Sequence, residues 1–195
     1  MLHPDTELKF VSKKIGYGVF ATKYISRGTL IWVKDELDRI FPKEELSKFS
    51  PANLDNFLKY TYRTRTGDYL FCWDLTRYAN HSFGPNSMLT SLGFEIAIRD
   101  INPGEEITND YGTLNIIEPF QCAHDPNHER THVRPDDLTR FYNRWDGQIL
   151  SVFPSITVVP QPLKKFLTQD LQGRIQLIKD GQDKLPSVLT NYFQT

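Results

Sequence analysis

The first third of the chain carries short apolar stretches that are separated by glycines. ELKFV, GVFAT and TLIWV lie at residues 7–11, 18–22 and 29–33, and they are rich in β-branched and aromatic side chains. Such stretches, bounded by glycine, are typical of short strands joined by tight turns. The pattern therefore predicts that the chain begins with strands.

The middle of the chain combines helical spacing with further strands. Residues 42–62 predict a helix with a break at Pro51, because apolar residues recur there at helical intervals. Residues 60–74 predict a hairpin that turns near residues 66–68. FEIAIRDI, at residues 94–101, alternates like a strand, and the turn NPGEE leads from it into EITNDYG.

After about residue 133 the pattern becomes helical. Segments 134–153 and 161–181 carry apolar residues at helical spacing, and Pro135 and Pro162 lie near their starts, where proline is tolerated. The chain is thus predicted to be an α+β protein, with strands first and helices last. We expect a first domain over residues 1–120 and a C-terminal helical appendage over residues 121–195.

Composition and charge narrow the function classes. With 195 residues and a net charge of −1, the chain is predicted to be a soluble domain with a small appendage, without direct nucleic-acid binding. No apolar run approaches the ~20 residues of a membrane span, and the first ten residues lack the apolar core of a signal peptide. Cys72 and Cys122 fit a reduced compartment, so a cytoplasmic location is expected, with a nuclear one open for a eukaryotic source.

Three polar stretches carry the candidate chemistry. IGYGVFA, RYANHSFGPNS and PGEEITNDYG lie at residues 15–21, 77–87 and 103–112. Each alone is compatible with a simple turn, because Gly, Asn, Ser and Pro all favour turns. His81 beside Ser82 raises the idea of a hydrolase, but neighbouring residues rarely point together and no Gly-x-Ser-x-Gly elbow is present. Hydrolase chemistry is therefore set aside.

In order and spacing, the three stretches resemble the signature motifs of the SET domain, the lysine methyltransferase fold. RYANHS with the following Pro-Asn resembles RFINHSCxPN, and GEEITNDYG resembles GEELTFDYG. The resemblance spans about residues 8–120 and leaves out residues 133–195. It implies a SET-domain fold of short sheets with a knot-like crossing of the last two motifs, and S-adenosylmethionine as the cofactor.

The resemblance also implies which residues form the site. It assigns cofactor binding to Gly16, Tyr17, Gly18, Asn80 and His81. Tyr111 matches the family's catalytic tyrosine, and Tyr60 resembles a second tyrosine of the channel, although Tyr62 is an alternative for that place. The expected reaction is methyl transfer to the neutral ε-amine of a lysine in a protein substrate. The alternative is a non-catalytic SET-like module that binds a peptide or another partner, and the oligomeric state stays open.

The sequence also departs from the family pattern. Many members carry a zinc-binding Cys after NHS, where this chain has Phe83. A possible substitute is the set Cys122, His124, His128 and His132, but its spacing is irregular, and we expect no metal there. The chain is thus expected to be a minimal, stand-alone SET protein. Ile96 is assigned to the position that controls the degree of methylation, and Trp145 and Phe120 are the aromatic candidates for covering the cofactor.

Overall fold

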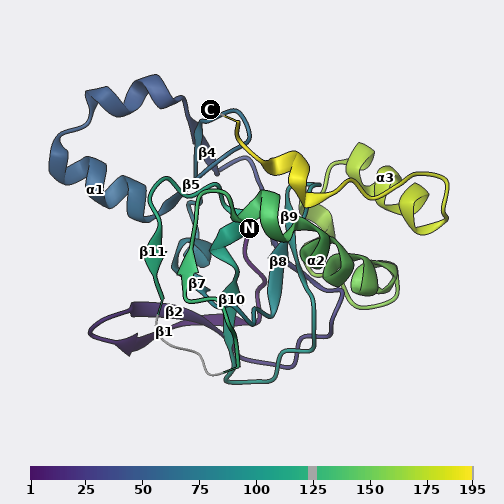
Figure 1. Ribbon diagram of the computed structural model, residues 1–195. Coiled ribbons are helices and arrows are strands. Elements are labelled where there is room, and N and C mark those ends of the chain that lie inside the picture. The colour runs from purple at the N-terminus through teal and green to yellow at the C-terminus, as the bar shows by residue number, and fades with distance from the viewer. Residues whose placement is uncertain (123–126, 195) are drawn as a thin grey trace.

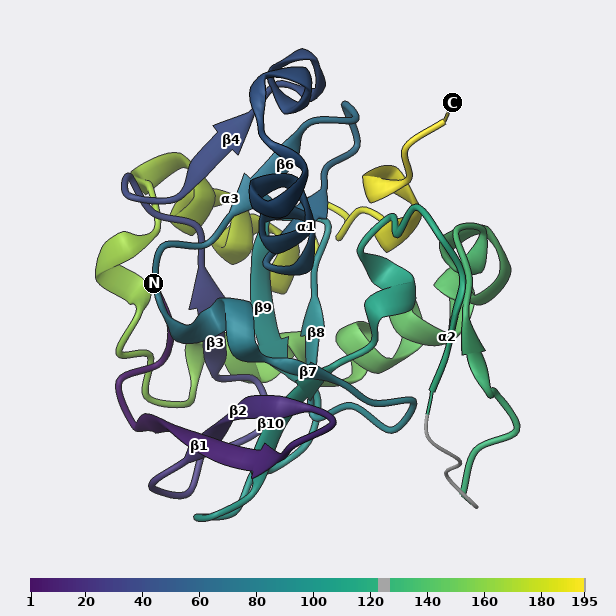
Figure 2. The same cartoon turned by 90° about the vertical axis from the view of Figure 1, so that its left-hand side faces the viewer.

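The computed structural model describes residues 1–122 and 127–194, and it places small sheets between two groups of helices (Figures 1 and 2). Helix α1 lies on one side of the sheets, and α2 and α3 lie on the other. The α-helices are α1 Pro51–Lys59, α2 Asp137–Val152 and α3 Gln169–Lys179. The strands are β1 Thr6–Ser12, β2 Gly16–Ala21, β3 Leu30–Val33, β4 Arg39–Phe41, β5 Thr61–Arg63, β6 Tyr69–Phe71, β7 Asn80–His81, β8 Ser87–Leu89, β9 Phe94–Ala97, β10 Glu106–Asn109, β11 Phe120–Gln121 and β12 His132–Val133. The α+β class predicted from the sequence is confirmed.

The largest sheet joins the three motif stretches. Its strand order is β1-β2-β10-β7, so that strands distant in sequence become neighbours. Strands β1 and β2, two of the short strands predicted from the sequence, pair as an antiparallel hairpin, and β10 pairs antiparallel with β2. Strand β7 then pairs with β10 in parallel. The segment before the tight turn at Pro85 and the segment before Tyr111 therefore run side by side.

The main hydrophobic core joins the sheet β3-β9-β8 to the C-terminal helices. It includes Leu30, Met88, Phe94 and Ile96 from the strands and Leu138, Trp145, Ile149 and Val152 from α2. The apolar residues of α2 recur at helical spacing, so they face the sheet together. The domain boundary at residue 120 stays a prediction, and this core contains residues from both sides of it.

The helical pattern of residues 42–62 is divided in two. A 3-10 helix covers Lys43–Lys48, and α1 begins at Pro51 rather than merely being interrupted there. Ser50 caps α1 by accepting a hydrogen bond from the Asn53 N–H, and proline fits the first helical position. The hairpin predicted after it is found as β5 and β6, which form a sheet with β4.

The second C-terminal helix is shorter than the sequence pattern indicates. Segment 161–181 forms a 3-10 helix at Lys164–Phe166 and then α3. Thr168 separates them, because its side chain accepts a hydrogen bond from the Leu171 N–H and so caps α3. The apolar residues on both sides of Thr168 still reach the core, which is why the pattern looked continuous.

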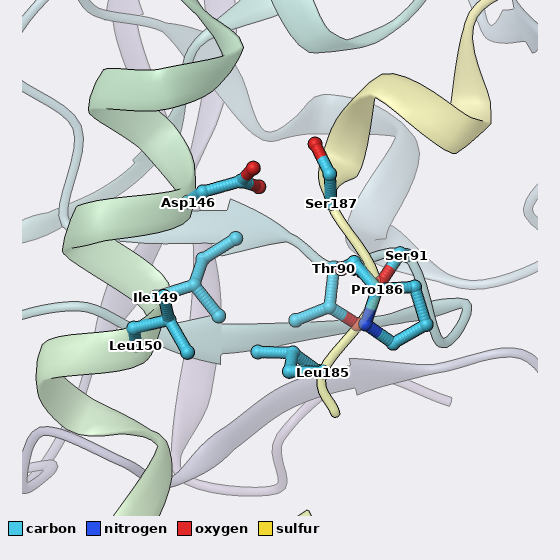
Figure 3. Close-up of a pocket in the computed structure, with 8 residues that line it drawn as sticks. All are labelled: Thr90, Ser91, Asp146, Ile149, Leu150, Leu185, Pro186 and Ser187. Atoms are coloured by element: carbon cyan, nitrogen blue, oxygen red, sulfur yellow. Dashed lines mark hydrogen bonds between the residues drawn. The ribbon is translucent and has the colours of Figure 1, made fainter. Parts of the chain in front are cut away.

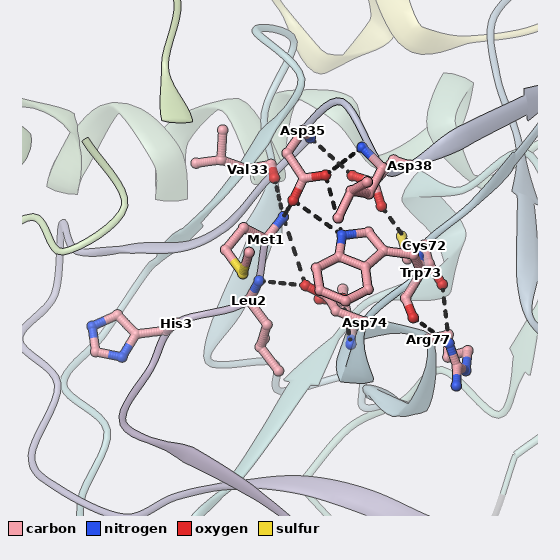
Figure 4. A network of polar contacts seen from close by, with 12 residues as sticks. Met1, Leu2, His3, Val33, Asp35, Asp38, Cys72, Trp73, Asp74 and Arg77 are labelled. Carbon is pink, nitrogen blue, oxygen red and sulfur yellow. Dashed lines mark hydrogen bonds and ion pairs between the residues drawn. The ribbon is translucent and has the colours of Figure 1, made fainter. Parts of the chain in front are cut away.

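A polar network fixes the segment that precedes β7 (Figure 4). The Met1 amine forms an ion pair with Asp35 at 2.9 Å and lies 3.6 Å from Asp74. Asp74 also accepts a hydrogen bond of 2.5 Å from the Leu2 N–H, and the Trp73 indole donates to Asp35 at 3.1 Å. These contacts hold the turn at residues 73–78 against β3, immediately before the Asn80 motif.

The C-terminal segment closes over the end of β8. A cavity of about 120 Å³ lies between α2 and residues 185–187 (Figure 3). Ser91 donates a hydrogen bond of 2.6 Å to the Pro186 carbonyl, and the Val188 N–H donates to Asp146 at 2.8 Å. The end of the chain is therefore tied both to α2 and to the loop between β8 and β9.

Gln161 links the C-terminal region to the β3 strand. Its side-chain oxygen accepts from the Leu30 N–H at 2.8 Å. Its side-chain nitrogen donates to the Gly28 carbonyl at 2.8 Å and to the Ile156 carbonyl at 2.9 Å. One half-buried amide thus satisfies three backbone groups.

We predict that Gln161→Leu destabilises the protein. The substitution keeps the side-chain volume similar but leaves these backbone groups without partners, which should lower the free energy of unfolding by about 2–3 kcal/mol. Urea unfolding measures this, with Gln182→Leu, a change of an exposed side chain, as the matched control. Equal stability of Gln161→Leu and wild type would show that the C-terminal region is not held through this residue.

Candidate functional site

The parallel pair of β7 and β10 forms the centre of the candidate site. Thr108 lies opposite Asn80, and Asn109 lies opposite His81. The buried Asn86 side chain fixes this arrangement: it donates to the Glu106 carbonyl at 2.7 Å and accepts from the Thr108 N–H at 2.9 Å. The Asn86 side chain therefore bonds to the backbone of β10 as a neighbouring strand would, and this contact holds the two motifs in register.

Asn80 connects the first motif to the other two. Its side-chain nitrogen donates to the Tyr17 carbonyl at 3.1 Å and to Glu106 Oε1 at 2.6 Å. A Cβ atom on Gly18 would lie 2.2 Å from Glu106 Oε1 and 2.9 Å from Asn80 Nδ2, so a side chain at this position would displace these two polar groups. Gly16 is required for a different reason, because its φ of +90° is unfavourable for other residues.

Tyr111 is anchored to the β7 segment at both ends. Its backbone N–H donates to His81 Nδ1 at 3.1 Å, and its hydroxyl donates to the Ala79 carbonyl at 2.7 Å. Burial raises the pKa of the Tyr111 hydroxyl well above its ordinary value, so the group is neutral near pH 7. The ring is thus held rigidly beside the crossing of the two motifs.

His81 is a buried, neutral histidine. Burial lowers its pKa to about 4, and the positive charge of Arg130 acts in the same direction. Because Nδ1 accepts from Tyr111, the ring proton belongs on Nε2. Within residues 1–122 and 127–194, this buried Nε2 has no hydrogen-bond partner.

Arg130 occupies the place next to Phe83. Its guanidinium pairs with Asp110 and, at 2.5 Å, with Asp137, and it lies 4.5 Å from the centre of the Phe83 ring. Where many SET proteins have a zinc-bound cysteine, this chain has an aromatic ring under a buried cation. In the part of the chain that the structure describes, no three His, Cys, Asp or Glu side chains gather as a metal site. His124 lies outside the described residues, so the expectation of no zinc stays a prediction.

A cavity of about 430 Å³ opens on the other face of Tyr111. Tyr60 and Tyr62 both line it, which leaves the choice between them for the second channel position open. Tyr60 packs edge-on against Tyr78, with ring centres 5.3 Å apart, and burial raises the pKa of Tyr62 well above its usual range. The other lining residues include Trp32, Leu58, Cys72, Ala79, Leu114, Ile116, Ile117 and Phe120.

The inner wall of this cavity is polar, and none of the three motifs predicted it. Glu95 and Asn109 line the cavity, whereas Ile96 points to the opposite side of β9 and packs in the main core. The assignment of Ile96 to the channel is therefore wrong, because successive side chains of a strand face opposite sides. The signal was present in FEIAI, where a single acidic residue interrupts an apolar strand.

Of the other aromatic residues predicted to lie at the site, Tyr17 and Phe120 are exposed and Trp145 is buried. Tyr17 is half exposed and packs against Phe10 and Tyr78, with ring centres 5.7 and 6.3 Å away. Phe120 is partly exposed and packs against His81 and Tyr111. Trp145 is buried in the core, 2% exposed, so of the two candidates only Phe120 presents a ring surface at the site.

The comparisons with known proteins concern the part of the chain that contains the three motifs. Residues 16–112 match the model of the SET domain, and this part of the chain belongs to the SET domain family. The variant-silencing SET domain-containing protein of Plasmodium falciparum (isolate 3D7) is 32% identical over 144 residues, which cover 66% of this chain and 6% of that protein. A crystal structure of a candidate histone methyltransferase from P. falciparum covers 56% of this chain and 95% of its own, with 21% identity and a TM-score of 0.41. Among the described residues, no helix has the length and apolar character to cross a membrane.

We predict that His81 makes the stability of the protein depend on pH. The unfolded chain binds a proton at His81 below about pH 6.5, whereas the folded protein does so only near pH 4. The stability that His81 contributes is therefore complete above pH 6.5 and is lost as the pH falls toward 4. Relative to His81→Asn or His81→Gln, the free energy of unfolding of wild type should fall by up to about 3 kcal/mol between pH 7 and 4. Urea unfolding across this range measures it, and a constant difference would contradict the buried, neutral state.

Proposed function

We propose that this chain is a protein-lysine N-methyltransferase that uses S-adenosylmethionine. The observation that carries the proposal is the meeting of Asn80, His81 and Tyr111 on the β7–β10 pair, with a tyrosine-lined cavity directly behind Tyr111. A protein or peptide that presents a lysine is the substrate that fits this cavity. The cytoplasmic location stays a prediction of the sequence, and both cysteines are free thiols.

The residues on the outer side of the crossing are suited to hold the cofactor. At Gly16 no atom lies within 4 Å of the position that a Cβ atom would take, so a ligand can approach the backbone there, and the unpaired His81 Nε2 offers a donor. Asn80 uses its amide nitrogen within the protein and retains its oxygen as an acceptor. When bound, S-adenosylmethionine supplies a methyl group carried on a positively charged sulfur.

The cavity on the inner side is suited to a lysine side chain. Its largely aromatic and aliphatic walls remove the amine from water, which favours the neutral form that attacks the methyl group. The Tyr111 hydroxyl donates its proton to the Ala79 carbonyl, so the hydroxyl oxygen can only accept a further hydrogen bond. That oxygen can receive an N–H of the substrate and thereby direct the amine lone pair, which makes alignment the main contribution of Tyr111.

We predict that Asn80→Ala weakens S-adenosylmethionine binding at least tenfold. The substitution also removes the bonds to Tyr17 and Glu106, so a loss of about 1–2 kcal/mol in stability is expected alongside. Isothermal titration calorimetry measures the affinity, with Asn56→Ala on the exposed face of α1 as the control. Wild type that binds no S-adenosylmethionine would favour the non-catalytic module instead.

Tyr111→Phe is predicted to lower the rate of a single methyl-transfer turnover about 100- to 1000-fold, by analogy with the loss of one oriented polar group in a desolvated site. The ring remains, so cofactor affinity should change little, although the Ala79 carbonyl loses its partner and about 1 kcal/mol of stability. Transfer of a labelled methyl group to lysine-containing peptides at saturating cofactor measures the rate. Tyr24→Phe, on an exposed tyrosine, is the control, and a Tyr111→Phe rate within twofold of wild type would remove Tyr111 from the mechanism.

A further inference from the structure

The inner wall of the Tyr111 cavity contains a buried carboxyl group. Glu95 is 7% exposed, and its side chain belongs to the lining of the cavity. It accepts hydrogen bonds from Asn109 Nδ2 at 2.7 Å and from Ser87 Oγ at 3.3 Å. A carboxylate has room for about four such bonds, so half of its capacity is left for another donor.

The wall offers a second acceptor next to the first. Asn109 is 2% exposed, and its Oδ1 has no hydrogen-bond partner within the described residues. Its Nδ2 donates to Glu95, so Oδ1 is the amide atom that remains available to a ligand. The Glu95 carboxylate and Asn109 Oδ1 are thus two neighbouring acceptors on a buried wall, and a ligand with several N–H donors would satisfy both.

No cation of the described chain neutralises Glu95. The ion pairs among residues 1–122 and 127–194 do not include it, and its partners Asn109 and Ser87 are both neutral. A buried carboxylate without a cation is costly, and such groups are concentrated at functional sites. A ligand that carries a positive charge would therefore suit this wall.

We propose that Glu95, assisted by Asn109, is the group that receives the charged amine of the substrate and accepts its proton. This inference rests on the proposed function and adds a catalytic residue to it. The substrate R–NH₃⁺ transfers one proton to the Glu95 carboxylate, which gives R–NH₂ and a neutral carboxylic acid. The amine lone pair then forms the N–CH₃ bond while the S–CH₃ bond breaks, and the sulfonium becomes a neutral thioether. The proton on Glu95 returns to solvent after the product leaves.

The electrostatic surroundings agree with this role. Burial raises the pKa of Glu95 to about 7, and the negative charge of Asp74 adds to it, so the group exchanges a proton near neutral pH. The titratable groups that face it, Tyr62, Cys72 and Tyr111, have raised pKa values and are neutral there. The other charged residues of the lining are Lys59, Arg63, Arg77 and Glu118.

Binding of a simple amine tests the recognition step without the cofactor. We expect n-butylammonium, titrated at pH 8 and followed by nuclear magnetic resonance, to bind wild type at least tenfold more tightly than Glu95→Gln. Lowering the pH to 5.5 should weaken binding to wild type, because Glu95 then carries a proton. Glu44→Gln removes an exposed carboxylate outside the cavity and should leave the affinity unchanged. Equal binding by wild type and Glu95→Gln would overturn the inference, whatever the outcome for S-adenosylmethionine.

The rate of transfer tests the proton step separately. With poly-L-lysine as acceptor, Glu95→Gln should reduce single-turnover transfer at pH 7 about 100-fold or more, the usual contribution of a general base. The deficit should shrink toward pH 10, where the free amine is already neutral. Calorimetry should give both proteins the same affinity for S-adenosylmethionine. Glu95→Asp, which keeps the charge, should retain the wild-type pH profile at a lower rate, and a pH-independent deficit in Glu95→Gln would contradict the proton transfer.

Discussion

The pairing of two very short strands, β7 and β10, is the constraint on which the site depends. A two-residue strand cannot maintain its register through backbone bonds alone. The buried amide of Asn86 adds two bonds to β10, and the Ser82 N–H donates to the Asn109 carbonyl at 3.0 Å. A slip of one residue would turn every side chain of β10 to the other face and remove Asn109 from the cavity. The position of Tyr111, two residues further on, follows from this register.

The ion pairs of Arg130 fix the other end of the crossing. Asp110 immediately precedes Tyr111, and Asp137 begins α2, so one guanidinium joins the turn at Tyr111 to the C-terminal helix. The stacking of Arg130 between Phe83 and Phe141 shields these charges, with ring centres 4.5 and 4.6 Å away. A buried pair of this kind contributes little net stability, but leaving one partner alone is expensive. It therefore specifies one position for the segment that follows the SET motifs.

The sequence allowed the fold class, most of the early strands and the motif residues to be predicted, because each depends on local signals. Gly16, Gly18, Asn80, His81 and Tyr111 were found through their order and spacing, and the structure brings them together. The roles of Asn86 and Arg130 could not be predicted, because Asn86 bonds to Glu106 and Thr108 and Arg130 pairs with Asp110, all at least 20 residues away in sequence. Ile96 shows a different limit. The alternation of β9 was recognised, but the face that points to the cavity was confused with the face that packs in the main core. Glu95 was missed for the same reason.

The two buried titrating groups have opposite effects on proton uptake. Between about pH 4.5 and 6.5, unfolding lets His81 bind a proton that it refuses in the folded protein, whereas Glu95 releases one that folding makes it keep. The two changes have equal size and opposite sign, so the sum contributes no slope to the stability in this range. When the protein unfolds in this range, Glu95 loses a proton and the His81 imidazole gains one, so the number of protons bound by the two groups stays the same. The effects of His81 and Glu95 on the free energy of unfolding therefore offset each other in this range, although each group alone would make the stability depend on pH.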